Sequence, residues 1–143
     1  MKKNIFSVLM LLMLSLVANA QIKTSRQYIP IDIDIKVKRC VVSGSQGYID
    51  LVFTNNTGEF IKNVVVQSSE TCLDKNNETI VYDDEGNVYK YTYQGGIYKI
   101  TFGGESGQYD GANLPEDVPV KMRIEIENIS EYATEFTMLN IAF

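Results

Sequence analysis

The amino-acid sequence predicts an all-β fold in which about seven to eight antiparallel strands pack as a sandwich. Apolar and polar residues alternate strictly over residues 29–37, and this period of two is typical of a half-buried strand. Turns rich in glycine, asparagine and proline recur at short intervals, and no segment has the period of an amphipathic helix. Many short strands separated by such turns favour two packed antiparallel sheets.

The expected strands follow one another with short interruptions. Their residue ranges are 29–37, 49–54, 60–67, 78–82, 88–93, 97–102, 120–127 and 134–143. Residues 43–47 and 55–58 supply turns after the first two strands, because glycine and asparagine tolerate positive φ. Residues 103–113 contain four glycines and are expected to form the longest irregular segment.

The first 20 residues have the layout of a secretory signal. Two lysines precede a thirteen-residue, mostly apolar stretch, residues 5–17, and Ala18 and Ala20 supply the small residues of a cleavage site. The stretch is shorter than the about 20 residues of a membrane helix, so we expect no membrane span after cleavage. The expected organisation is a signal peptide over 1–20, a flexible lead-in over 21–27 and one β-sandwich domain over 28–143. Export would place the protein in the periplasm, at the cell surface or outside the cell.

Composition argues against nucleic-acid binding and against catalysis. The chain has 13 Lys and Arg against 18 Asp and Glu, and loss of the two signal lysines leaves 11 against 18, a net charge of −7. An acidic domain does not attract phosphate backbones, so we expect no nucleic-acid partner. The sequence contains no histidine and no nucleophile elbow, which excludes the Ser-His and Cys-His pairs of acyl transfer. We therefore expect no enzyme activity, no cofactor and no metal centre.

Two cysteines, Cys40 and Cys72, remain in the exported domain. An even pair in an oxidising compartment is most simply one disulfide. The alternative is two buried free thiols. Without histidine, two cysteines do not complete a tetrahedral zinc site.

Four of the nine tyrosines lie between residues 89 and 98. If Gly95 and Gly96 form a two-residue hairpin turn, the flanking strands place six apolar residues on one face. These residues are Tyr89, Tyr91, Tyr93, Tyr98, Ile100 and Phe102. Because the opposite face is mostly polar, burial of this face in the sandwich is expected. The alternative is a carbohydrate-binding platform in which Tyr91, Tyr93 and Tyr98 stack on sugar rings.

Residues 83–87 place three acidic side chains in a hairpin loop. Oxygen ligands at this density could hold calcium, although the spacing is not that of an EF-hand loop. The sequence favours a solvated turn and leaves calcium as the alternative.

A resemblance emerges at residues 50–58, at the aspartate-glycine hairpin 83–89 and at the late strand 118–124. The chain resembles small exported immunoglobulin-like sandwich proteins of Gram-negative gut-type bacteria. The resemblance implies an antiparallel immunoglobulin-like β-sandwich of about seven to eight strands that is secreted or associated with the cell envelope. It implies no catalytic residues, and the Cys–Trp–Cys core of antibody domains is absent because the sequence has no tryptophan.

A second resemblance is to immunoglobulin-fold cysteine-protease inhibitors of the chagasin type. Residues 55–58 and 104–107 are similar to two of their binding loops, but the Arg-Pro-aromatic element of the third loop is absent.

Together these features predict a non-catalytic secreted or envelope-associated binding domain whose partner is a protein or another envelope component. The expected binding residues lie in the loop formed by Asn55, Asn56, Thr57 and Gly58, since loops on a rigid sandwich are free to vary. The loops 83–87 and 103–113 are further candidates. A glycan partner bound through the tyrosines is one alternative, and a structural subunit that exchanges strand 29–37 or the C-terminal strand is another.

Overall fold

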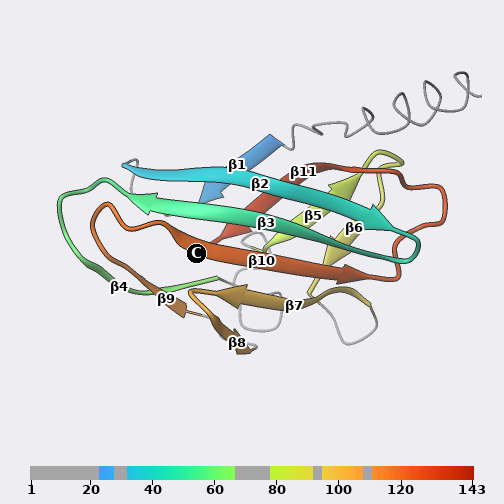
Figure 1. Cartoon of the computed structure of the whole chain (residues 1–143). Coiled ribbons are helices and arrows are strands. Elements are labelled where there is room, and N and C mark those ends of the chain that lie inside the picture. The colour runs from blue at the N-terminus through green and yellow to red at the C-terminus, as the bar shows by residue number, and fades with distance from the viewer. Residues whose placement is uncertain (1–22, 28–31, 67–77, 92–94, 108–110) are drawn as a thin grey trace, which may run out of the picture.

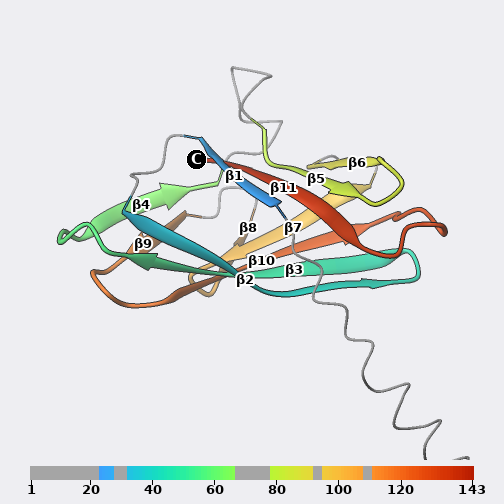
Figure 2. The ribbon, with the colours of Figure 1, turned by 90° about the horizontal axis from the view of Figure 1, so that it is seen from above.

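The computed structural model describes residues 23–27, 32–66, 78–91, 95–107 and 111–143. Within these residues the chain forms eleven strands and no helix. Two larger sheets lie one behind the other, with a small two-stranded sheet beside them (Figure 1, Figure 2). Nearly all neighbouring strands are antiparallel, so the all-β sandwich predicted from the sequence is confirmed.

The larger sheet has five strands, and its outer face is turned toward the viewer in Figure 1. In spatial order the strands are β2 (Ile33–Ser43), β3 (Gln46–Asn55), β10 (Val120–Glu127), β7 (Gly96–Phe102) and β8 (Glu105–Gly107). β2 and β3 form a hairpin, and its turn lies at Gly44 and Ser45, inside the predicted turn 43–47. Gly44 has a φ of 60°, a value that favours glycine.

The second sheet has four strands, and a separate pair stands at the side of the sandwich. The four are β1 (Lys23–Gln27), β11 (Phe136–Ala142), β5 (Ile80–Asp83) and β6 (Val88–Lys90), in that spatial order. The pair is β4 (Ile61–Val65) and β9 (Gly111–Leu114). β1 runs parallel to β11, whereas β11, β5 and β6 are antiparallel to one another.

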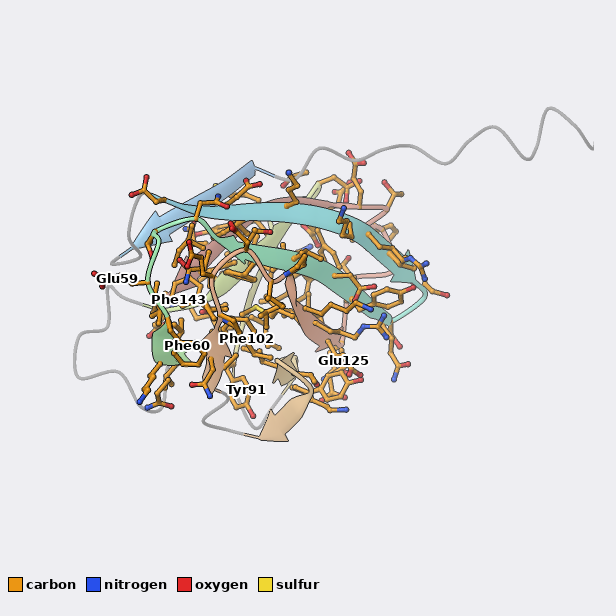
Figure 3. All side chains as sticks on the ribbon, turned by 60° about the vertical axis from the view of Figure 1, so that its left-hand side comes forward. Glu59, Phe60, Tyr91, Phe102, Glu125 and Phe143 are labelled. Carbon is orange, nitrogen blue, oxygen red and sulfur yellow. The ribbon has the colours of Figure 1, made fainter. Side chains whose placement is uncertain are left out.

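The core lies between the two larger sheets, and the alternating residues supply it. Ile49, Leu51 and Phe53 of β3 are buried, as their period of two predicts. The ring centre of Phe53 lies 4.9 Å from that of Phe102 and 5.8 Å from that of Phe143. Phe143 directly follows β11 in the opposite sheet, and Phe102 and Phe143 are labelled in Figure 3. These aromatic contacts hold the two sheets together at one end of the core.

Several strand boundaries differ from the expected ones. β1 falls within residues 21–27, which were expected to be a flexible lead-in. β8 falls within the segment 103–113, which was expected to be irregular, and β9 begins in that segment. Polar and glycine-rich sequence carries no period of two, so only pairing with a neighbouring strand reveals these short strands. The strand predicted over 29–37 corresponds to β2, which begins at Ile33 among the described residues. β2 continues to Ser43 and so extends beyond the alternating pattern.

The predicted hairpin at Gly95 and Gly96 is wrong. β6 and β7 lie in different sheets, because β6 pairs with β5 and β7 pairs with β10 and β8. Gly95 and Gly96 have φ values of 111° and 108°, so the two glycines give the conformational freedom for a crossing between sheets. The glycine pair therefore does not join two neighbouring strands of one sheet.

A β-bulge also changes which residues of β7 face the core. Glu125 pairs with Lys99 and Ile126 pairs with Ile97, so Tyr98 is an extra residue on β7. Ile97 is consequently buried, and Tyr98 is 39% exposed. The expectation that Tyr98 lies on the buried face with Ile100 and Phe102 is therefore wrong, although the latter two are buried.

Candidate functional site

The loop predicted to bind a partner is braced from inside by Asn55. This side chain is fully buried, and its Nδ2 donates to the carbonyl oxygens of Glu59 at 2.6 Å and Leu114 at 2.8 Å. Its Oδ1 accepts from the backbone N–H of Thr57 at 3.0 Å and from the Thr57 hydroxyl at 2.7 Å. Every donor and acceptor of the amide is used within the chain, so Asn55 holds the loop against β9.

The other three predicted residues of this loop differ in their exposure to solvent. Asn56 and Gly58 are exposed, and the half-buried Thr57 is held by Asn55. Gly58 has a φ of 80° in the left-handed region. The loop therefore presents a rigid tip in which only Asn56 and Gly58 of the four predicted residues face solvent.

The two described tyrosines of the predicted sugar platform do not share a face. Tyr91, labelled in Figure 3, is half-buried and packs against the core. Tyr98 is exposed, and its hydroxyl donates to Glu125 Oε2 at 2.8 Å. This hydrogen bond raises the pKa of Tyr98 above its ordinary value. Tyr93 lies outside the described residues. Tyr91 and Tyr98 therefore offer no common stacking surface.

Two of the three carboxylates in the acidic loop 83–87, those of Asp83 and Asp84, are hydrogen-bonded within the chain. Asp83 is buried and accepts the Tyr89 hydroxyl at 2.6 Å, the Asn87 side chain at 2.9 Å and the N–H groups of Glu85 and Asn87. Burial acts to raise the pKa of Asp83, but these hydrogen bonds outweigh it and lower that pKa below its ordinary value. Asp84 accepts from the N–H and hydroxyl of Thr134, which ties the turn to the β10–β11 loop. This arrangement favours a structural turn over a calcium site.

Cys40 is a half-buried free thiol on β2, and Cys72 lies outside the described residues. Burial raises the pKa of the Cys40 thiol. The disulfide between these two cysteines stays a prediction.

A groove runs over the outer face of the five-stranded sheet and forms the strongest candidate site. Its volume is about 900 Å³, and it is lined by outward-facing side chains of β2, β3, β7 and β10 and by the turn that follows β7. Its charged lining residues are Lys38, Arg39, Asp50, Lys121, Arg123 and Glu125. Four basic side chains thus face two acidic ones, although the chain as a whole carries a net charge of −5.

Arg123 is the fixed centre of this groove. Its Nε donates to Asp50 Oδ1 at 2.6 Å and its Nη2 donates to Asp50 Oδ2 at 2.8 Å, a bidentate pair across β10 and β3. The guanidinium carbon also lies 4.4 Å from the ring centre of Tyr48, within the range of a cation–π contact. The hydrogen bonds to Asp50 raise the pKa of Arg123.

Arg39 extends the cluster toward β2. Its Nη1 donates to the Tyr48 hydroxyl at 3.2 Å, and this hydrogen bond raises the pKa of Arg39. Lys38 and Lys121 are exposed and have no ion-pair partner in the part of the chain that the structure describes. The cluster therefore combines an ordered Tyr48–Arg123–Asp50 centre with basic side chains whose charge is available to a ligand.

Sequence reasoning missed this groove because its residues are far apart in the chain. Asp50 and Arg123 are adjacent only because β3 and β10 pair in a register that sets these two residues opposite each other. The available signal was the row of charged residues, basic and acidic, at the outward positions of two alternating segments, 33–39 and 120–127. A row of this kind is usual on a solvated sheet face, so the pattern alone did not distinguish a site.

Comparison with known proteins gives no relative. No family model matches the chain, and no curated protein and no solved structure is similar to it. Among the residues that the structure places, no helix has the length and apolar character needed to cross a membrane. The same residues include no group of three or more acidic or cysteine side chains arranged to hold a metal ion.

Proposed function

We propose that this protein is a non-catalytic binding domain, secreted or associated with the cell envelope, whose outer groove receives an anionic partner. The observation that carries the proposal is the excess of basic side chains in one groove of an acidic chain. Local charge of one sign inside a concave surface concentrates ligands of the opposite sign and speeds their association. The proposed partner is an acidic protein segment or envelope component that presents carboxylates.

Two kinds of basic side chain in the groove would contribute to recognition: the ordered Arg123 and the exposed residues around it. The Asp50 carboxylate and the Tyr48 ring hold Arg123 in one orientation, which lowers the conformational entropy lost on binding. Lys38, Arg39 and Lys121 surround this centre with exposed positive charge. A carboxylate entering the groove would meet N–H donors on β2 and β10 without breaking the Arg123–Asp50 pair.

A non-catalytic role fits the chemistry of the groove. The sequence has no histidine to act as a base near neutral pH. The two groove carboxylates are engaged, since Asp50 pairs with Arg123, and Glu125 pairs with Lys99 and accepts the Tyr98 hydroxyl.

We further propose that the sandwich is immunoglobulin-like. In that arrangement one sheet has the order A-B-E-D, and strands C, F and G form the other. Letters A to F are assigned in chain order to β2, β3, β5, β7, β10 and β11. The spatial order β2-β3-β10-β7 is then A-B-E-D, and β11-β5 is F-C. A crystal structure with a different strand order would overturn this assignment.

Binding of a labelled glutamate oligomer, followed by fluorescence anisotropy at low salt, tests the groove. We expect salt-sensitive binding, and we expect Lys121→Glu to weaken it by about tenfold, which corresponds to about 1.4 kcal/mol. Lys62→Glu is the matched control, because Lys62 is an exposed lysine on β4 and the change in net charge is identical. Equal weakening by both variants, or no binding at low salt, would contradict the proposal.

A further inference from the structure

β1 is attached to the sandwich as an edge strand through its backbone. Among the strands that the structure describes, it pairs with β11 alone, in parallel, and the register runs from Lys23 opposite Met138 to Gln27 opposite Ala142. Its sequence is Lys-Thr-Ser-Arg-Gln, which contains no apolar residue. The strand therefore adds hydrogen bonds to the sheet without adding hydrophobic residues to the core, and segments of this kind open at low free-energy cost.

The strand that receives β1 is much more firmly held. β11 pairs on its other side with β5, and it buries Phe136, Leu139 and Ile141 in the core. Removal of β1 would leave this strand in place with one row of N–H and C=O groups unpaired. An exposed edge of this kind is a template for another strand.

Five residues connect β1 to β2. Only residues 28–32 separate Gln27, at the end of β1, from Ile33, at the start of β2. β1 belongs to the four-stranded sheet and β2 to the five-stranded sheet (Figure 2). Packed sheets lie about 10 Å apart and a segment of this length reaches at most about 20 Å, so β1 is tethered close to its own sandwich. Exchange of a terminal element between identical chains is a low-cost route to a dimer.

We propose that the β11 edge is an interaction surface for the β1 strand of a second copy of this chain. The exchanged strand would form the same parallel hydrogen bonds that β1 forms within one chain. The balance between the two forms then depends on protein concentration relative to the effective concentration of the tethered strand. The surface is separate from the groove, which lies on the other sheet, and the inference does not depend on the groove.

Cysteine trapping tests this exchange directly. Ser25 and Asn140 are opposite each other in the β1–β11 register, and neighbouring strands lie about 4.8 Å apart, within the range that a disulfide bridges. Protein from a Ser25→Cys chain and protein from an Asn140→Cys chain are mixed, unfolded in urea, refolded together at rising concentration and oxidised. We expect a covalent heterodimer that increases with concentration, to at least about fivefold above controls.

The controls separate exchange from random oxidation. Ser25→Cys mixed with the unmodified chain measures the background from Cys40 and Cys72, and Ser25→Cys mixed with Lys62→Cys measures reaction with an exposed cysteine on β4. The double variant Ser25→Cys, Asn140→Cys reports the pairing within one chain. A heterodimer no more abundant than these controls at any concentration would overturn the proposal, and so would a double variant that forms no disulfide.

Discussion

Two clusters of polar side chains on this sandwich use their hydrogen bonds in opposite ways. The amide of Asn55 is fully buried, and all its donors and acceptors are satisfied by the chain. The cluster of Tyr48 and Arg123 lies at the surface beside Lys121, whose charge has no ion-pair partner within the described ranges. This difference indicates that a buried polar group whose hydrogen bonds are all made within the chain stabilises the fold. An ordered surface cluster beside an unpaired charge can instead bind a ligand.

The largest effect should come from Asn55→Ala. The substitution removes the buried donor that the carbonyl oxygens of Glu59 and Leu114 share and releases the loop, so we expect a loss of roughly 3 kcal/mol in the free energy of unfolding. Urea denaturation measures the change. Asn56→Ala is the matched control, because Asn56 is exposed, and it should change stability by less than about 0.5 kcal/mol. Similar values for both variants would remove the structural role assigned to Asn55.

Asp83 gives the next largest effect, and this effect depends on pH. Asp83→Ala should cost roughly 2 kcal/mol at neutral pH, because Tyr89 and Asn87 lose a buried acceptor. Since the folded state holds the pKa of Asp83 below its unfolded value of about 3.9, its contribution is present above that pH. The contribution is lost as the pH falls through the folded pKa.

Urea denaturation at several pH values tests this sign. The difference in stability between the unmodified chain and Asp83→Ala should narrow as the pH falls from about 5 to about 2. A difference that widens on acidification would show that the folded state does not favour the ionised Asp83.

Arg123→Lys should have a smaller effect on stability and a clear effect on binding. Lysine makes neither the bidentate pair with Asp50 nor the same stacking contact with Tyr48. Because the pair is exposed, we expect less than about 1 kcal/mol of lost stability, measured by urea denaturation. Binding of the glutamate oligomer should weaken severalfold in the anisotropy assay. A large loss of stability with unchanged binding would show that Arg123, like Asn55, stabilises the fold and does not bind the ligand.

Tyr98→Phe should have the smallest effect. The substitution removes an exposed hydrogen bond to Glu125 and retains the ring, so the free energy of unfolding should change by less than about 0.5 kcal/mol. Thermal unfolding measures it. A loss well above this value would mean that the bulge at Tyr98 depends on the hydrogen bond to Glu125.

Periodicity predicted the strands that supply the core, and pairing determined the rest. The alternating residues Ile49, Leu51 and Phe53 are buried, and so are Ile124 and Ile126 of β10. Burial requires only that one face of a strand meet another layer, so local sequence is sufficient for this inference.

Local sequence does not predict to which sheet each strand belongs. A glycine pair favours a hairpin, but it also permits the crossing that separates β6 from β7. The bulge at Tyr98 depends on the register with Glu125 and Ile126, which lie almost 30 residues away. The turn signal at Asn55 likewise describes a surface loop, while the burial of its amide depends on Leu114 in β9. These features depend on pairing between strands that are distant in the sequence, and local sequence patterns do not show which strands pair.

An amide-resolved NMR titration with the glutamate oligomer tests the central claim most directly. If the groove is the binding surface, the largest chemical-shift changes occur at Arg39, Tyr48, Lys121 and Arg123, and added salt reverses them. Changes confined to the loop of residues 55–58, or spread evenly over the surface, would contradict the account.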